Sequence, residues 1–211
     1  MSTTVLSCFM DLFNPDPRAN LLPRDGEVVY FGPQLPVAEA DRYFEVLEST
    51  LPWRPDEARI GGKHYVTDRA VAWFGDQAYS YTYSGVTKTA LPWTVELREL
   101  KDLTERVTGE TYNSCLANLY HTGTESMAWH SDGEKLLKKN GAIASLSLGA
   151  ERKFSFKHKD TQEKVDVFLQ HGSVLVMRGP CQTHWLHRLP PTKKVTRPRI
   201  SLTFRTIVAQ P

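Results

Sequence analysis

Cysteine, long apolar runs and repeated segments are scarce or absent in this sequence of 211 residues. The three cysteines, Cys8, Cys115 and Cys181, are odd in number, widely spaced and without a CxxC motif. That pattern argues against a disulfide scaffold and fits a reducing compartment. No apolar run reaches the ~18 residues that a membrane span needs. The segment from Met1 to Asn14 lacks a basic region followed by an apolar stretch, so we expect no signal peptide.

The composition is that of an ordinary globular protein, with 40% hydrophobic and 24% charged residues. The length predicts one domain with extensions and a sizeable core. We therefore expect a monomer in the cytoplasm, or in the nucleus of a eukaryotic cell.

The net charge of +2 conceals an asymmetry between the two parts of the chain. Residues 1–115 carry 11 basic and 17 acidic residues, whereas residues 116–211 carry 15 basic and 7 acidic residues. The second part has a net charge of +8, which would attract a polyanion such as nucleic acid. A solvated basic surface without a partner is the alternative.

The first half of the sequence predicts two helices. Residues 37–50 and 93–108 have apolar residues at helical spacing, and Gly109 ends the second segment. Residues 1–35 predict irregular or weakly extended chain, and residues 53–91 predict short aromatic-rich strands. The aromatic residues Trp73, Phe74 and Tyr79 in that stretch fit either a core or ligand contacts.

The chain after Thr111 predicts an all-β region. Turn signals such as Asn140-Gly141 separate several of the strand candidates. The candidates are 114–120, 127–131, 142–148, 152–158, 164–169, 173–178, 182–187 and 199–208. About eight short strands after two helices predict a mostly β fold with flanking helices, a jelly roll.

A His-x-Asp pair, His130 and Asp132, is the strongest chemical signal. Because side chains alternate along a strand, both residues would lie on one face of an extended segment. Two histidines and one carboxylate can hold one face of a ferrous ion and leave the opposite positions open. The third ligand must come from elsewhere, and His187 is the leading candidate, with His184 as its competitor.

The last predicted strand alternates polar and apolar residues from Arg199 to Arg205. In a jelly roll around a metal the polar face can point inward, where a guanidinium needs an anion. An outward-facing edge strand would produce the same alternation. At the extended rise the two arginines lie about 20 Å apart, so the sequence leaves open how both could serve one compact diacid.

Several motifs between about residue 60 and residue 208 occur together. In the second half they are Asn118-Leu119-Tyr120, His130-Ser131-Asp132-Gly133-Glu134, Ala144–Gly149, Phe156–Lys159, His184-Trp185-Leu186-His187 and Pro198–Arg205. In the first half they are Phe74-Gly75-Asp76, Tyr81–Gly85 and Pro92-Trp93. Together these motifs resemble the AlkB family of iron(II)- and 2-oxoglutarate-dependent nucleic-acid repair dioxygenases, in the branch that includes the vertebrate DNA-repair members. The motifs of the first half resemble the nucleotide-recognition lid of that family.

The resemblance implies a double-stranded β-helix with an N-terminal lid, and a role for each matching residue. Residues 1–110 would form the extension, helices and lid, and residues 111–211 the catalytic core of one integrated domain. The implied catalytic residues and iron(II) ligands are His130, Asp132 and His187. The implied 2-oxoglutarate site consists of Asn118, Tyr120, Arg199, Ser201 and Arg205, with Arg199 at the distal carboxylate. The implied base-contacting residues are Tyr81, Tyr83, Ser84, Gly85 and Glu134.

The reaction that the resemblance implies is oxidative dealkylation of bases such as N1-methyladenine and N3-methylcytosine in DNA, with RNA as a further candidate. It would consume O₂ and 2-oxoglutarate and release formaldehyde. The alternatives are an iron(II)/2-oxoglutarate hydroxylase or demethylase of a protein or small molecule, a zinc hydrolase, and a non-catalytic nucleic-acid-binding module.

The sequence departs from the family pattern at two positions. Ser201 stands where some relatives carry an asparagine beside 2-oxoglutarate. Gly61 falls where duplex-specialised relatives place a bulky wedge that fills the gap left by a flipped base. We therefore expect single-stranded DNA to be favoured over duplex, unless Ile60 acts as the wedge. A tight turn at Gly61-Gly62 is an equally good explanation.

Overall fold

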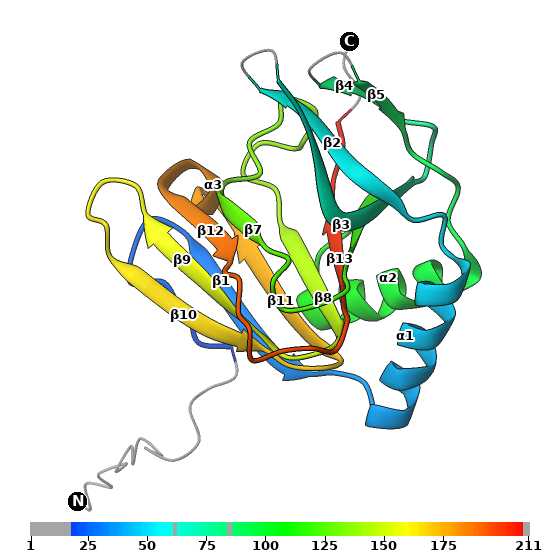
Figure 1. Cartoon of the computed structure of the whole chain (residues 1–211). Coiled ribbons are helices and arrows are strands. Elements are labelled where there is room, and N and C mark those ends of the chain that lie inside the picture. Colours follow the sequence, from blue (N-terminus) through cyan, green and yellow to red (C-terminus); the bar gives the residue numbers. More distant parts are fainter. Residues whose placement is uncertain (1–17, 61–62, 84–85, 209–211) are drawn as a thin grey trace, which may run out of the picture.

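The computed structural model describes residues 18–60, 63–83 and 86–208, and it describes their side chains except those of 58–60, 63–65, 81–83, 86 and 87. These residues form two antiparallel sheets, a separate two-stranded hairpin, two long helices and one short helix (Figure 1). The predicted wedge at Gly61 and Gly62, and the predicted base contacts Ser84 and Gly85, lie outside the described residues.

The large sheet has seven strands in the order β1-β11-β8-β13-β6-β3-β2. Its strands are β1 (Glu27–Pro33), β2 (Arg54–Ile60), β3 (Lys63–Gly75), β6 (Ser114–Tyr120), β8 (Ile143–Gly149), β11 (Ser173–Arg178) and β13 (Arg199–Arg205). Strands from both halves of the chain therefore share one sheet. The proposed division at residue 110 stays a prediction.

The small sheet has the order β10-β9-β12-β7, and a separate hairpin pairs β4 with β5. Their strands are β10 (Lys164–Leu169), β9 (Arg152–His158), β12 (Trp185–Leu189), β7 (Met127–His130), β4 (Ser80–Tyr83) and β5 (Val86–Thr89). A mostly β chain in antiparallel sheets flanked by helices confirms the predicted jelly roll.

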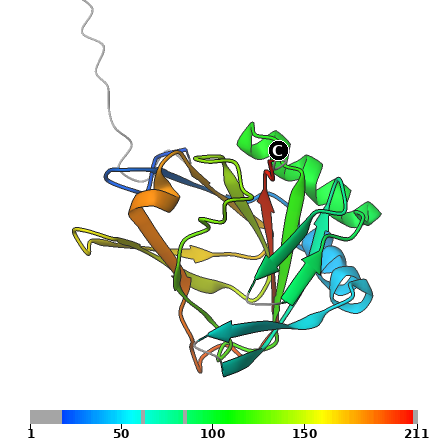
Figure 2. The same ribbon diagram turned by 90° about the horizontal axis from the view of Figure 1, so that it is seen from above.

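Two helices cover the face of the large sheet that points away from the small sheet (Figures 1 and 2). Helix α1 spans Val37–Thr50, as predicted. Helix α2 spans Val95–Thr108, two residues shorter than predicted at its start, because the Thr94 hydroxyl accepts a hydrogen bond from the Leu97 N–H and caps it. Gly109 ends it in the left-handed conformation, with φ 72°.

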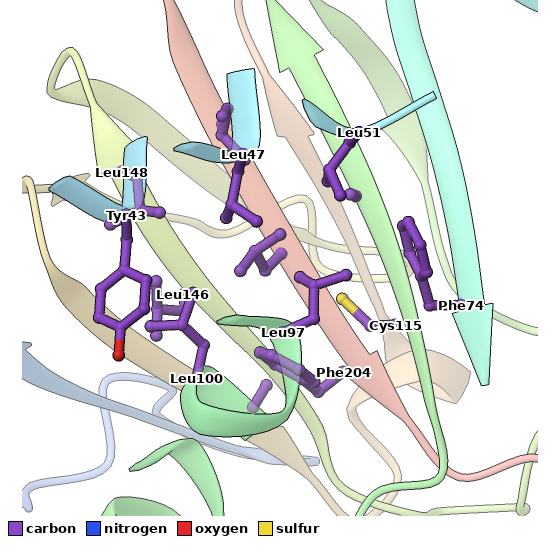
Figure 3. Packing of buried hydrophobic residues seen from close by; sticks show 14 of the residues in the cluster. Tyr43, Leu47, Leu51, Phe74, Leu97, Leu100, Cys115, Leu146, Leu148 and Phe204 are labelled. Atoms are coloured by element: carbon purple, nitrogen blue, oxygen red, sulfur yellow. The ribbon is translucent and has the colours of Figure 1, made fainter. Parts of the chain in front are cut away.

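Two apolar clusters hold these layers together. Figure 3 shows the larger one, in which Leu47 of α1 and Leu97 and Leu100 of α2 pack toward Leu146 of β8 and Phe204 of β13. The smaller cluster joins the two sheets and includes Val28, Leu175, Phe156, Leu169 and Trp185. The polar residues of the candidate site therefore lie on strands that are fixed by packing on both sides.

One sequence prediction was wrong in detail and another was incomplete. The predicted strand 182–187 begins with a helical turn, α3 (Cys181–His184), because the Pro180 carbonyl accepts hydrogen bonds from Thr183 and His184, and the strand runs later, as β12. Residues 1–35 contain a regular strand, β1, which pairs with β11 along the edge of the large sheet. The sequence predicted irregular or weakly extended chain there, and β1 is the extended part, with its regular pairing set by contact with β11.

No helix among the described residues is long and apolar enough to cross a membrane.

A substitution at Gly149 tests how closely the end of β8 packs against the start of β13. Its φ is +84°, and a Cβ at this position would lie 2.5 Å from the Pro198 carbonyl oxygen and 2.9 Å from the Phe44 ring. We expect Gly149→Ala to lower the free energy of unfolding by about 2–3 kcal/mol in urea denaturation. Gly179→Ala is the matched control, because Gly179 also has positive φ but open space around it. It should cost only ~1 kcal/mol, and equal losses would contradict the steric argument.

A candidate metal centre and its pocket

Three side chains from two paired strands and the loop after one of them converge on a single point. His130 ends β7 and pairs with His187 of β12 in the ladder of the small sheet. Asp132 follows β7, and its Oδ1 lies 3.6 Å from Nε2 of His130 and 3.8 Å from Nε2 of His187. Their ligand atoms all lie within 4.8 Å of one another. The structure thus brings together the three predicted iron ligands.

Asp132 lies outside the strands, and a hydrogen bond to its backbone N–H holds it in place. The sequence predicted a strand through residue 131, but β7 ends at His130 and Asp132 lies in the following loop. The Asp132 N–H donates a hydrogen bond of 2.9 Å to Oε1 of Gln182, in α3. Sequence reasoning missed Gln182, because its contact depends on the helical turn that the sequence did not predict.

The orientation of His130 suits a metal ligand. Its Nδ1 lies 2.8 Å from the carbonyl oxygen of Ala128, which can only accept a hydrogen bond. Nδ1 therefore carries the proton, and the lone pair of Nε2 faces Asp132. Metal-bound histidines commonly donate the other ring N–H to a carbonyl in this way.

The electrostatics favour a charged Asp132 and a neutral His187. Burial alone would raise the pKa of Asp132, but the positive charge of Arg205 is the main cause that lowers it below the usual value. Arg205 Nε lies 3.6 Å from Asp132 Oδ2. Burial lowers the pKa of His187 to about 4, so the ring is neutral near pH 7. An ionised carboxylate and a neutral imidazole are the forms that bind a divalent cation.

A second histidine group includes His184, the competitor of His187, but its geometry suits a structural role. His158, Asp160 and His184 also bring their ligand atoms within 4.8 Å of one another. His158 is buried, and its Nδ1 accepts from the N–H groups of Asp160 and Thr161, at 3.3 and 3.1 Å. Its Nε2 lies 3.2 Å from Asp25. Both ring nitrogens are thus engaged, which favours the group around His187 as the metal centre.

Arg199 supplies a buried positive charge that lacks an anionic partner. Only 2% of the residue is exposed. Its Nη2 donates a hydrogen bond of 2.9 Å to Ser147, and its Nε has no hydrogen-bond partner in the described part of the chain. Among the described residues no carboxylate forms an ion pair with Arg199, and burial lowers its pKa to about 10. A buried guanidinium in this state fits an anionic ligand such as a carboxylate.

The other predicted co-substrate residues lie along the same strands. Tyr120 of β6 is the ladder partner of Arg199, whose guanidinium carbon lies 5.8 Å from the centre of its ring. Asn118 pairs with Ser201 in the same ladder, and the Ser201 hydroxyl lies 3.2 Å from that of Ser145. Arg205 lies at the metal ligands and Arg199 at the opposite end of β13, so the separation that the sequence predicted remains, and a shared role at one diacid stays a prediction.

A cavity of about 590 Å³ lies beside the metal ligands. Residues of both halves of the chain line it, among them Asp56, Trp73, Lys88, Ser131, Glu134 and Arg205. Glu134 Oε1 lies 3.3 Å from Nη1 of Arg205, and its buried Oε2 has no hydrogen-bond partner among the side chains that the structure describes. An unpaired carboxylate oxygen suits a ligand that donates hydrogen bonds or carries positive charge.

The aromatic residues of the first half divide between core and cavity. Phe74 is 2% exposed and belongs to the core, whereas Trp73 lines the cavity, its Nε1–H donating to Ser114. Alternation along β3 was the available signal for this difference. The backbones of Tyr81 and Tyr83 lie in β4, but their side chains lie outside the described residues.

Comparison with known proteins places these features in context. The sequence model of the 2OG-Fe(II) oxygenase superfamily matches residues 27–205. The DNA oxidative demethylase ALKBH2 of Homo sapiens is 40% identical over 182 residues, which cover 81% of this chain and 70% of that protein. The alpha-ketoglutarate-dependent dioxygenase alkB homolog 3 of Homo sapiens is 39% identical over 185 residues, covering 83% and 64%.

Solved structures support the fold. A structure of OsALKBH1 has a TM-score of 0.55 at 19% identity, covering 81% of this chain and 91% of that one. A Pseudomonas putida prolyl-4-hydroxylase has a TM-score of 0.54 at 15% identity, covering 85% and 92%. Likeness at this level of identity concerns the arrangement of strands and helices alone.

The two histidine groups make opposite predictions for metal binding. We expect His187→Ala to weaken Mn(II) binding by on the order of 100-fold or more, because it removes a direct ligand rather than an outer partner. His184→Ala should leave the affinity within about threefold of the unmodified protein. Titration calorimetry measures both, with circular dichroism as the check on folding. Loss of affinity in His184→Ala but not in His187→Ala would reverse the assignment.

Proposed function

This chain belongs to the AlkB family of the 2OG-Fe(II) oxygenase superfamily, and we propose that it removes N-alkyl groups from DNA bases by oxidation. As a family member it is a dioxygenase that uses Fe(II), 2-oxoglutarate and O₂. Relatives named for DNA oxidative demethylation, at 40% identity, support DNA as the substrate. The substrates of the proposal are bases of the N1-methyladenine and N3-methylcytosine type, with formaldehyde as the second product.

One observation carries the proposal: two histidines and an aspartate converge at one point, and the same fold buries an arginine that forms no ion pair with a carboxylate among the described residues. We assign His130, Asp132 and His187 as the Fe(II) ligands, a donor set that fits this ion and leaves positions open. The proposed 2-oxoglutarate site consists of Arg199 and Tyr120 at the distal carboxylate and Asn118, Ser201 and Arg205 toward the metal.

The protein's own groups prepare the site for that chemistry. When bound, the iron with its co-substrate and O₂ supplies the oxidising power for attack on the N-alkyl carbon. Arg205 keeps Asp132 ionised, and burial keeps His187 neutral, so neither ligand must lose a proton near pH 7. The amide of Gln182 and the carbonyl of Ala128 fix the directions of Asp132 and His130.

Base recognition is proposed for the cavity and the β4–β5 hairpin. An alkylated base inside a duplex must leave the stack to reach a buried metal. The unpaired Oε2 of Glu134 suits a cationic methylated base, whose charge a carboxylate stabilises. Tyr83 would stack on the base with ~1–3 kcal/mol, and Tyr81, Ser84 and Gly85 would complete the contacts.

The finer statements about partners are also part of the proposal. Single-stranded DNA is favoured, duplex DNA is accepted, and RNA is a further candidate substrate. The charge of +8 in residues 116–211 supports a polyanionic partner. The protein acts as a monomer in the cytoplasm, or in the nucleus of a eukaryotic cell.

Formaldehyde release tests the function. The unmodified protein, loaded anaerobically with Fe(II) and 2-oxoglutarate, should release formaldehyde from an N1-methyladenine oligonucleotide once O₂ is admitted. Arg199→Ala should raise the KM for 2-oxoglutarate on the order of 100-fold, since it removes a buried charged contact. Arg197→Ala, an exposed arginine two residues earlier, is the matched control and should change it less than about threefold. An unchanged KM in Arg199→Ala would remove Arg199 from the site.

Strand preference tests the reading of Gly61. The same methylated base should be repaired faster in a single-stranded oligonucleotide than in a duplex, because glycine cannot fill the gap left by a flipped base. Gly61→Phe should raise the rate on duplex while leaving the single-stranded rate within about twofold. Initial rates of formaldehyde release measure both, and a strong duplex preference in the unmodified protein would contradict this interpretation.

A further inference from the structure

An irregularity in the β2–β3 ladder turns two charged side chains toward the site. Pro55 pairs with Ala70 and Glu57 pairs with Val66, so Asp56 faces a longer segment of β3 that includes Arg69. The Thr67 hydroxyl donates a hydrogen bond of 2.8 Å to the Arg69 carbonyl and stabilises this segment. Irregularities of this kind redirect side chains and recur next to active sites.

Arg69 links a predicted co-substrate residue to Asp56. The residue is 5% exposed, and its guanidinium donates from Nη1 to Oδ1 of Asn118 and from Nη2 to Oδ2 of Asp56. A buried guanidinium is costly unless a charged partner accompanies it. Asp56 is therefore the group that allows Arg69 to lie against Asn118.

Contact with Arg69 fixes which way the Asn118 amide points. A guanidinium only donates hydrogen bonds, so the oxygen of Asn118 must face Arg69 and its NH₂ must face away. Nδ2 has one weak contact within the described residues, 3.4 Å from the Leu116 carbonyl. Asn118 therefore presents N–H donors, the groups that an anionic co-substrate needs.

The same carboxylate of Asp56 also holds the β4–β5 hairpin. Its other oxygen, Oδ1, pairs with the ammonium of Lys88 in β5. Lys88 is the ladder partner of Tyr81, one of the proposed base contacts. A two-stranded hairpin is marginally stable by itself, so an ion pair to the neighbouring sheet helps to fix its position. Asp56 and Lys88 both line the cavity that also contains Glu134 and Arg205.

We propose that Asp56 is a positioning residue that joins the base-recognition hairpin to the co-substrate site through the series Lys88–Asp56–Arg69–Asn118. This inference rests on the proposed function for the roles of the two ends. One side of Asp56 orients the Asn118 amide toward 2-oxoglutarate, and the other side fixes the hairpin that holds the nucleic acid. Asp56 lines the cavity, but its two carboxylate oxygens are engaged by Arg69 and Lys88, so in this assignment it acts through these two cationic partners.

The two halves of the series differ in burial, which makes them separable. The side chains of Lys88 and Asp56 are 37% and 27% exposed, so solvent screens their attraction. The Arg69 side chain is 6% exposed, so its pair with Asp56 is screened much less. Loss of Lys88 should therefore act weakly and on the hairpin alone, whereas loss of the Asp56 charge should act on both ends.

Two binding assays test the series without requiring turnover. Fluorescence anisotropy gives the Kd of a labelled single-stranded oligonucleotide, and tryptophan fluorescence gives the Kd of 2-oxoglutarate in the presence of Mn(II). Lys88→Met should raise the oligonucleotide Kd roughly three- to tenfold and leave the 2-oxoglutarate Kd within about twofold. Asp56→Asn should raise both, the 2-oxoglutarate Kd by about tenfold. The double variant should bind the oligonucleotide no more weakly than Asp56→Asn alone.

Matched controls separate positioning from general electrostatics and from folding. Lys164→Met removes an exposed positive charge from β10, and Asp102→Asn removes an exposed negative charge from α2. Neither should change either Kd by more than about twofold. Lys88→Arg keeps the ion pair and should restore oligonucleotide binding. Asp56→Glu keeps the negative charge. If Asp56→Asn unfolds, the 2-oxoglutarate Kd of Asp56→Glu provides a second test of the contact with Arg69.

Four outcomes would overturn the proposal. An unchanged 2-oxoglutarate Kd in Asp56→Asn would disconnect Arg69 from the co-substrate site. Equal effects of Lys88→Met and Lys164→Met on the oligonucleotide Kd would show that Lys88 contributes only general electrostatic attraction for the nucleic acid. Additive effects of Lys88→Met and Asp56→Asn on the oligonucleotide Kd would show that the two residues act independently. A folded Asp56→Glu variant that binds 2-oxoglutarate as weakly as Asp56→Asn would show that the charge of Asp56 is not what supports 2-oxoglutarate binding. If the protein binds both ligands but releases no formaldehyde, the proposed function is contradicted, whereas the proposed role of Asp56 in joining the two binding sites is not.

Discussion

The pairing of β7 with β12 is the constraint on which the site depends. It places His130 opposite His187, and it brings the loop after β7 close enough for Asp132 to complete the group. A carboxylate at this depth would be unfavourable alone, but Arg205 from the large sheet compensates its charge. The small sheet thus supplies the ligands and the large sheet supplies the charge that keeps one of them ionised.

The apolar clusters explain how polar residues can occupy the interior of this jelly roll. On β13, Ile200, Leu202 and Phe204 belong to the cluster beneath the helices, so the alternate residues must point toward the small sheet. That alternation commits Arg199, Ser201 and Arg205 to the interior. The cost of burying Arg199 is tolerable in a protein whose co-substrate is a dicarboxylate.

Much of this arrangement follows from local sequence patterns. Helix α1 and most strands of the second half were predictable because apolar periodicity and turn residues agree there. The choice between His184 and His187 was not, because the alternation rule assumes a strand, and Pro180 starts a helical turn instead. The contacts of Asp56, Arg69 and Lys88 were also beyond prediction, since they depend on a ladder irregularity and on a meeting of β2 with β5 that no local pattern encodes. The sequence motifs were enough to predict the family and its fold. Which side chains contact one another depends on the register of the strands, which the motifs do not specify.

The two histidines of the centre differ in their access to solvent. The His130 side chain is 34% exposed, whereas His187 is 6% and Asp132 is 9% exposed. His187 and Asp132 therefore form the buried half of the coordination shell, and His130 completes it from the rim. The path of an ion to the centre would then pass His130, on the side where the ligands meet solvent. Chelators and competing cations would meet the site from that side first.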